Sequence, residues 1–317
     1  MIELLNDADH YTSVIEQNER RLSAYYGPIS DILDNVGVGQ SPVAVVAVGS
    51  DGKLERHPQS QTELILLKQA TVPSIKAQFT SLAQSPSNIF RNELMYARDG
   101  QTFEYDVDGP TPLCRVYGNP NAQYPDNLLN SSFVAGSPDV YYQMRRRLLI
   151  EMTTQDSLGK SIRDDMKEQL SAYRRCLRSG VYRQAQVIDP YKGIQYYHED
   201  PNHKTTALGL KMPFLRTIQR KLDLITTQAI QKGLIDLNDV AVNCPTNTAD
   251  RIRYLQDRRI LSPDTDSIIE AYQWALRHYH NAQETYRTQQ KPIEVYFDPT
   301  VYFNFVDQVE AFSLIQL

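Results

Sequence analysis

The chain has 317 residues, which is long enough for two packed units that each bury a core. Its hydrophobic fraction of 41% and charged fraction of 22% are ordinary for a globular protein. The formal net charge of −5 provides no global positive field for nucleic acid, so no nucleic-acid partner is expected.

Membrane insertion and secretion are not expected either. No apolar stretch approaches the roughly 20 residues that a membrane-spanning helix needs. The three cysteines, Cys114, Cys176 and Cys244, are scattered without metal-type spacing. An odd number of unpatterned cysteines fits a reducing compartment, and we therefore expect a cytoplasmic protein without membrane contact.

The N-terminal segment 1–36 is expected to be helical. Residues 8–26 have polar-rich helical character, and the helix is predicted to end near Gly27-Pro28. A turn over Gly37 to Pro42 then precedes the first apolar run.

That run, Val43 to Val48, is short, β-branched and uninterrupted, as in a strand buried on both faces. Gly49, Ser50 and Gly52 follow it directly. Small residues in such a turn let backbone N–H groups approach a ligand closely and cradle phosphate oxygens. Lys53 adds a positive charge beside them.

A second apolar run of strand type begins at Leu64, directly after Ser60-Gln61-Thr62-Glu63. Gln61 and Glu63 are two residues apart and share one face of this strand. Two carboxylates at these positions would hold Mg²⁺ against nucleotide phosphates. Here only Glu63 carries a charge.

Residues 73–84 are predicted to form a helix that returns over the sheet. The segments 89–98 and 101–108 are predicted strands, with Asp99-Gly100 as a hairpin turn between them. In the second segment, Glu104, Asp106 and Asp108 share one face. Such alternation is also common on the solvated face of an edge strand.

Residues 109–131 are predicted to form a long loop because they are rich in Pro, Gly and Asn. Helices are expected from there on, over 138–155, 157–179, 211–232, 249–259 and 265–289. The aromatic tail VYFDPTVYFNF, residues 295–305, has strand-like character.

Residues 49–64, GSDGKLERHPQSQTEL, resemble the active-site motif of the polymerase-β-like nucleotidyltransferase superfamily, in the form found in PII uridylyltransferases. The positions that match in register are Gly49, Gly52, Glu55, His57, Pro58, Ser60 and Leu64. Gln61 stands where the first metal-binding Asp belongs, and Glu63 replaces the second. Residues 197–211 are similar to a second uridylyltransferase segment, and 252–284 resemble its helical region.

The resemblance implies a nucleotide cleft. Gly49, Ser50, Gly52, Lys53 and Ser60 would line its phosphate side, while Lys204 and Lys211 would face the nucleotide or substrate. Glu63 would bind the metal, Gln61 would offer a neutral oxygen, and a third carboxylate would complete the site. We expect Asp106 in that role, with Glu104 and Asp108 as alternatives.

An α+β fold follows from the resemblance and the predicted elements. We expect a nucleotidyltransferase-like domain with a small mixed sheet over 37–135, after the segment 1–36. A helical bundle domain is expected over 136–317.

Two functions remain open. The first is Mg²⁺- or Mn²⁺-dependent transfer of a nucleoside monophosphate from a nucleoside triphosphate to a hydroxyl of an acceptor protein or small molecule. The second is a catalytically inactive nucleotidyltransferase fold that senses nucleotides or binds proteins. Gln61 favours the second function, and Glu63 favours the first.

Overall fold

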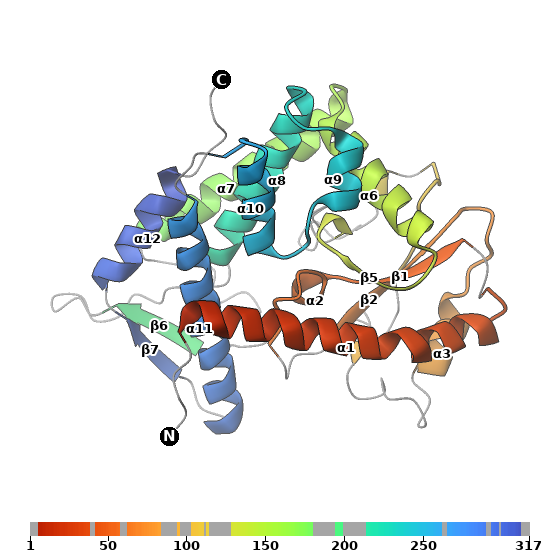
Figure 1. The fold of residues 1–317 in the computed structure, drawn as a ribbon, viewed down its shortest axis with the longest axis horizontal. Coiled ribbons are helices and arrows are strands. Elements are labelled where there is room, and N and C mark those ends of the chain that lie inside the picture. Colours follow the sequence, from red (N-terminus) through yellow and green to blue (C-terminus); the bar gives the residue numbers. More distant parts are fainter. Residues whose placement is uncertain are drawn as a thin grey trace. The chain divides into compact units, whose positions relative to one another are not determined.

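The computed structural model describes residues 6–38, 42–57, 62–83, 94–95, 103–110, 112–113, 128–179, 194–198, 214–261, 265–289, 293–297 and 299–311. The protein is α+β, with a mixed sheet and helices followed by a largely helical region (Figure 1). The chain forms two compact units. The sheet unit contains Ser13–Ile162 and Ile230–Asp250, and the helical unit contains Arg163–Ala229, Arg251–Leu317 and the N-terminal residues to Thr12.

The sheet of the sheet unit has the strand order β3-β2-β1-β5. β1 (Val43–Ala47) lies between β2 (Thr62–Lys68) and β5 (Ser132–Gly136) and is antiparallel to both. The short strands β3 (Leu94–Met95) and β4 (Phe103–Asp106) pair in succession with β2, and both are parallel to it. The sheet is therefore mixed, as its sequence predicts.

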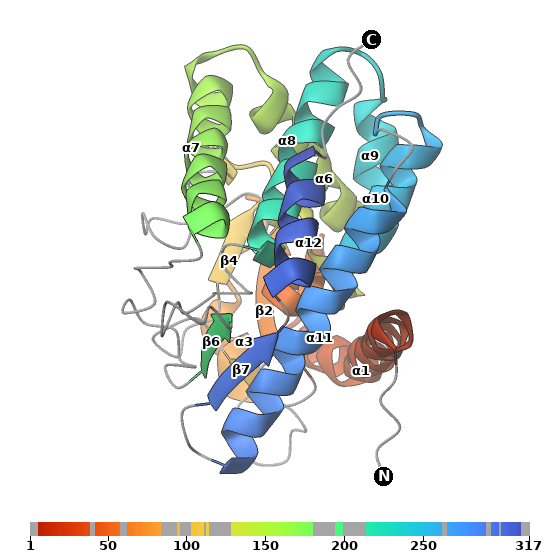
Figure 2. The ribbon, with the colours of Figure 1, turned by 90° about the vertical axis from the view of Figure 1, so that its left-hand side faces the viewer.

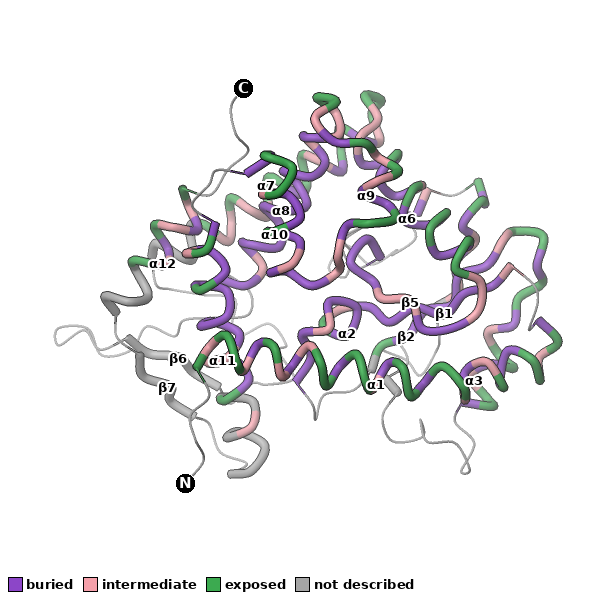
Figure 3. The backbone as a smooth tube through the Cα atoms, viewed as in Figure 1, coloured by how far each residue is buried: buried purple, intermediate pink, exposed green. Residues whose placement is uncertain are grey.

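One face of this sheet is covered by α1 (Asp7–Asn35) and α3 (Lys76–Ala83). Ile29 of α1 and Phe79 of α3 are fully buried against alternate residues of β1 and β2, among them Leu66. All five residues of β1 are buried, whereas α1 alternates between buried and exposed positions (Figure 3). This burial explains why β1 is an uninterrupted apolar run.

Three further helices belong mainly to the sheet unit. α2 (Gly49–Gly52) is one short turn directly after β1, and α6 (Pro138–Thr153) contacts β1, β2 and β5. α9 (Leu237–Asn243) packs against α6. The Asp236 carboxylate caps α9 by accepting from the backbone N–H groups of Asn238 and Asp239, at 2.9 and 3.0 Å.

The helical unit is built around α8 (Arg216–Gln231), most of whose residues are buried. Around it the chain forms α7 (Ser157–Ser179), α10 (Thr248–Asp257), α11 (Asp266–Gln289) and α12 (Pro299–Ala311). α12 contacts α11, and β6 (Ile194–His198) pairs in parallel with β7 (Ile293–Phe297) (Figure 2).

Two buried charged residues of α8, Asp223 and Lys221, have polar partners on other helices. The fully buried Asp223 accepts from Arg251 at 2.8 Å and lies 3.6 Å from the guanidinium of Arg220. Lys221 donates to the carbonyl oxygens of Val309 and Glu310 at 2.6 and 2.9 Å, which satisfies acceptors at the end of α12.

The N-terminal helix is longer than its sequence predicts. The expected end near Gly27-Pro28 is wrong, since α1 continues through Pro28 to Asn35. Ile29, Ile32 and Leu33 are buried against the sheet, and this packing outweighs the backbone hydrogen bond that a proline cannot donate.

Two further expectations are wrong. β3 and β4 both run parallel to β2 and along the same side of it, so they do not form the antiparallel hairpin that Asp99-Gly100 suggested; that dipeptide lies outside the described residues. The strand-like tail divides into β7 and the helix α12, which begins at Pro299. Proline suits the first turn of a helix because the N–H that it lacks would have no partner there.

The compact units also divide the chain differently from the predicted boundaries at 36/37 and 135/136. The reason is packing: α1 covers the sheet, and α6 and α9 contact the sheet unit rather than forming a separate bundle. Within the described ranges, no helix is long and apolar enough to cross a membrane.

The packing of α1 on the sheet can be tested by substitution. Ile29→Ala removes a fully buried side chain and should lower the free energy of unfolding by about 2–5 kcal/mol. Tyr26→Ala, on the same helix but 55% exposed, should change it by no more than about 0.5 kcal/mol. Urea denaturation followed by circular dichroism measures both, and equal effects of the two variants would contradict this packing.

Candidate functional site

Glu63 and the Gly49 turn lie side by side. The backbone N–H of Val48 donates to the carbonyl oxygen of Glu63 at 3.0 Å, which extends the β1–β2 ladder to the turn. A Cβ atom added to Gly49 would lie 3.0 Å from Oε2 of Glu63. Both Glu63 and Ser50 are exposed to solvent. The structure therefore brings together three of the residues expected at the nucleotide.

Gly49 adopts a conformation that other residues avoid. Its φ of 66° lies in the left-handed region, and α2 begins at this residue. The first N–H groups of a helical turn lack partners within the helix, so they are available to an acceptor such as a phosphate oxygen.

Gly52 and Lys53 face the protein rather than solvent, contrary to expectation. A Cβ atom added to Gly52 would lie 2.6 Å from the carbonyl oxygen of Asn130 and 2.7 Å from that of Ala47. Backbone atoms therefore fill this side of the residue. Lys53 is buried, and its ammonium group donates to the carbonyl oxygen of Gly49 at 3.1 Å. Both residues therefore shape the turn from its inner side.

A buried ionic cluster lies beneath the turn. Oδ1 of Asp51 accepts from Arg21 of α1 at 2.7 Å and from Arg56 at 3.3 Å, and Asp51 and Arg56 are almost fully buried. Burial raises the pKa of the Asp51 carboxyl to about 6, although the two guanidinium groups oppose the rise. The negative charge of Glu63 also raises this pKa, so the two carboxylates interact electrostatically.

Other residues of the motif hold the turn in place. Nδ2 of the buried Asn18 on α1 donates to the carbonyl oxygens of Leu54 and Arg56, both at 3.0 Å. Oε1 of the buried Glu55 accepts from the backbone N–H of Thr248, the first residue of α10, at 2.7 Å. These contacts satisfy buried polar groups and fix the path of the chain after α2.

Asp106 does not share a site with Glu63. It pairs in the ladder with Lys68, five positions further along β2 and roughly 17 Å away along the strand. Side chains of a strand alternate between the two faces, so Lys68 and Asp106 lie on the face opposite Glu63. The Asp106 carboxylate forms an ion pair with Lys68 at 2.5 Å. One metal ion cannot be bound by both Glu63 and Asp106.

The two alternative carboxylates also have structural partners. Glu104 accepts from the backbone N–H of Ile75 at 2.9 Å, and Asp108 accepts from that of Ala70 at 2.6 Å. Glu104 and Asp108 thus bind the chain that follows β2, and Asp106 binds Lys68 at the end of β2. This is a structural use of the carboxylate alternation in residues 104–108.

Four predicted site residues, Ser60, Gln61, Lys204 and Lys211, lie outside the described residues. Within the parts of the chain that the structure describes, no group of three or more His, Cys, Asp or Glu side chains could hold a metal ion. Glu63 is thus the one predicted metal ligand that the described structure places at the turn.

The cluster around Asp51 was missed by sequence reasoning. Asp51 occupies a variable position of the motif, and Arg21 precedes it by 30 residues on a helix rich in charged residues. A charged residue four positions after the end of the fully buried strand β1 was the available signal, because such a residue needs a partner if the turn is buried.

No protein-family model matches the chain. A comparison with curated proteins also finds no match. The resemblance of residues 49–64, 197–211 and 252–284 to nucleotidyltransferases therefore stays a prediction from the sequence.

The first prediction from this site concerns Gly49. Gly49→Ala would place a methyl group 3.0 Å from Oε2 of Glu63 and force alanine into the left-handed region, at a cost of about 1–2 kcal/mol in unfolding free energy. Gly27→Ala, in α1 with open space around it, should instead stabilise the protein by up to about 1 kcal/mol. Urea denaturation compares them; a stabilising Gly49→Ala would contradict the described turn.

The second prediction concerns the Asp51 carboxyl. Its pKa is about 6 in the folded state against 3.8 ordinarily, so between about pH 4 and 6 the folded protein keeps a proton that the unfolded chain has lost. The contribution of Asp51 to stability should therefore fall as pH rises through this window, by up to about 3 kcal/mol.

Unfolding free energies at pH 4 and pH 7 for the wild type and Asp51→Asn test this. The stability of the wild type relative to Asp51→Asn should be lower at pH 7 than at pH 4. A relative stability that rises with pH would mean that the arginines dominate and that the pKa of Asp51 lies below its ordinary value.

Proposed function

We propose that this protein is a nucleotidyltransferase-like nucleotide-binding protein that has lost efficient transfer. The Gly49–Ser50 turn would accept the phosphates of a nucleoside triphosphate, and Glu63 would bind the metal ion that accompanies them. The observation that carries the proposal is the position of the exposed Glu63 carboxylate beside the left-handed Gly49 turn.

The residues present fit one Mg²⁺ or Mn²⁺ ion that arrives with the nucleotide. Mg²⁺ in nucleotide sites is commonly held by one or two carboxylates together with phosphate oxygens and water. Glu63 supplies one such carboxylate, and a bound ion would neutralise phosphate charge. The described residues do not fit a two-metal site, because Asp106 lies on the other face of the sheet.

This incomplete ligand set favours nucleotide sensing or protein binding over transfer. Removing charged ligands from a two-metal site weakens the stabilisation of developing charge on which transfer depends. Gln61, in place of an aspartate, points in the same direction. We also keep two expectations from the sequence as proposals: a helical bundle domain over 136–317 and a location in the cytoplasm.

A second candidate is an active uridylyl- or adenylyltransferase that modifies a hydroxyl of an acceptor protein or small molecule. The observation that favours it is the retained, exposed carboxylate of Glu63 next to an exposed Ser50. In this reading the turn would position the nucleotide, and rate enhancement would come mainly from orientation of the reacting groups.

Isothermal titration with ATP, UTP, GTP and CTP, with and without Mg²⁺, tests the binding proposal. At least one triphosphate should bind more tightly with Mg²⁺, and Glu63→Gln should weaken that binding by about tenfold, since it removes a charged metal ligand. Asp106→Asn is the matched control, because Asp106 lies on the opposite face. An equal loss in both variants, or Mg²⁺-independent binding, would count against the site.

The same nucleotides with a label on the α-phosphate, incubated with the protein and a cell lysate, separate the two candidates. The binding proposal predicts no transfer by the wild type above the level of Glu63→Gln. Transfer that depends on Glu63 would establish the second candidate instead.

A further inference from the structure

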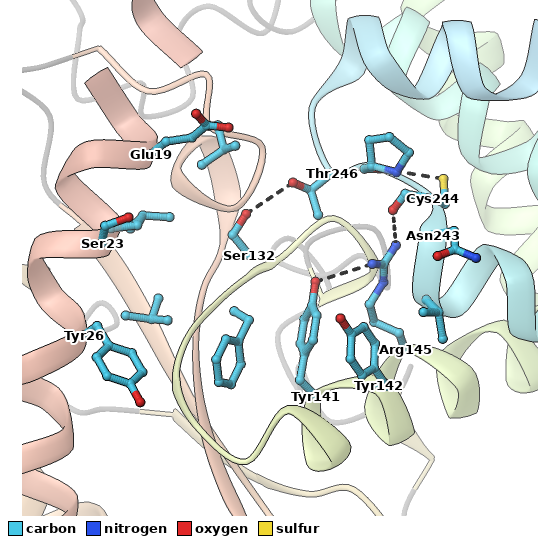
Figure 4. A pocket seen from close by; sticks show the side chains of 16 residues that line it. Glu19, Ser23, Tyr26, Ser132, Tyr141, Tyr142, Arg145, Asn243, Cys244 and Thr246 are labelled. Atoms are coloured by element: carbon cyan, nitrogen blue, oxygen red, sulfur yellow. Dashed lines mark hydrogen bonds between the residues drawn. The ribbon is translucent and has the colours of Figure 1, made fainter. Parts of the chain in front are cut away.

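A groove of about 800 Å³ lies within the sheet unit. Its floor is Ser132, Phe133 and Val134 of β5. One wall comes from α1, and the other from α6 and residues 242–246. Figure 4 shows Glu19, Ser23 and Tyr26 on α1 opposite Tyr141, Tyr142 and Arg145. We call this feature the β5 groove.

The β5 groove follows the edge of the sheet. β5 is the last strand in the order β3-β2-β1-β5 and pairs with β1 alone among the described strands. Three consecutive residues of β5 line the groove, although their side chains alternate between the two faces. The groove therefore runs along the outer edge of the strand, where backbone N–H and C=O groups point sideways.

The walls of the β5 groove expose apolar and aromatic surface. Tyr26 is 55% exposed, Val242 is 49% exposed and Tyr142 is 36% exposed, and these residues come from three different helices. Aromatic rings beside an open strand edge provide contact area for the side chains of an added strand, while the edge itself provides main-chain hydrogen bonds.

The exposed charged side chain of the β5 groove is Glu19. Arg145 also lines the groove but is buried, and its guanidinium donates to the carbonyl oxygen of Cys244 at 2.8 Å. The exposed Glu19 carboxylate favours a cationic side chain opposite it in the ligand.

We propose that the β5 groove binds an extended polypeptide segment of a partner protein, with a Lys or Arg side chain of that segment opposite Glu19. The segment would add to the sheet beside β5. This inference does not depend on nucleotide binding. The groove nevertheless adjoins the turn, since Ser132 Oγ donates to the carbonyl oxygen of Gly52 at 2.7 Å and Leu54, with a left-handed φ of 58°, also lines it.

The test is selection of random peptides, displayed on phage, against the full-length protein without nucleotide. The enriched peptides are then synthesised, and their binding is measured by fluorescence anisotropy. Enriched sequences should contain a Lys or Arg between β-branched or aromatic residues. Val242→Arg, which places a bulky charge in the groove, should weaken their binding by about tenfold or more.

Matched variants identify the surface. Ile150→Arg introduces the same change at a 48% exposed position of α6 outside the groove and should leave binding unchanged. Glu19→Gln should weaken binding of the peptides by about two- to fivefold, as expected for loss of an exposed ion pair. Glu16→Gln, one turn earlier on α1 and paired with Arg20, should have no effect.

Three results would overturn the proposal: no enriched peptide, enriched peptides without a basic residue, or binding that Val242→Arg does not weaken. Because nucleotide is omitted and Glu63 is unchanged, each of these results concerns the groove alone. Failure of nucleotide binding appears separately, in the titration of Glu63→Gln.

Discussion

The antiparallel pairing of β1 with β2 is the constraint on which the site depends. The ladder aligns Ala47 with Leu64, and the next backbone hydrogen bond, from Val48 to Glu63, brings the start of β2 to the end of β1. The turn at Gly49 and the carboxylate of Glu63 must then meet. A shift of one residue in this register would turn Glu63 to the opposite face, which is packed against α1 and α3.

A second layer of interactions holds the turn from below. Asp51, with Arg21 and Arg56, forms a buried ionic cluster, and Asn18 binds the backbone that follows. Removing one partner of such a cluster leaves an uncompensated buried charge, so its members depend on one another. Several residues that resemble an active-site motif are thus explained by the shape of the turn, whatever the turn binds. Residues that only shape the turn are consistent with the proposal that the fold binds nucleotide without efficient transfer.

Sequence patterns predicted the elements whose structure depends mainly on neighbouring residues. The β-branched run Val43 to Val48 indicated a strand buried on both faces, and the glycine after it indicated a turn. The same reasoning failed where contacts with distant residues determine the structure. The helix α1 continues beyond Pro28 because the residues after it are buried against the sheet. It also failed for Asp106, because strand alternation within 101–108 does not reveal which end or face of β2 the strand joins. The β5 groove could not be predicted, since its walls come from segments more than 100 residues apart.

The central claim is that metal-bound nucleotide lies at the Gly49–Glu63 corner of the sheet. The most direct measurement uses the paramagnetic ion Mn²⁺ with a triphosphate, and follows the line widths of assigned backbone amides by NMR. The amides of Gly49, Ser50 and Glu63 should broaden first and most, while those of Asp106 and Asp108 should broaden later and less. Broadening centred on Asp106, or none that depends on the triphosphate, would contradict the account.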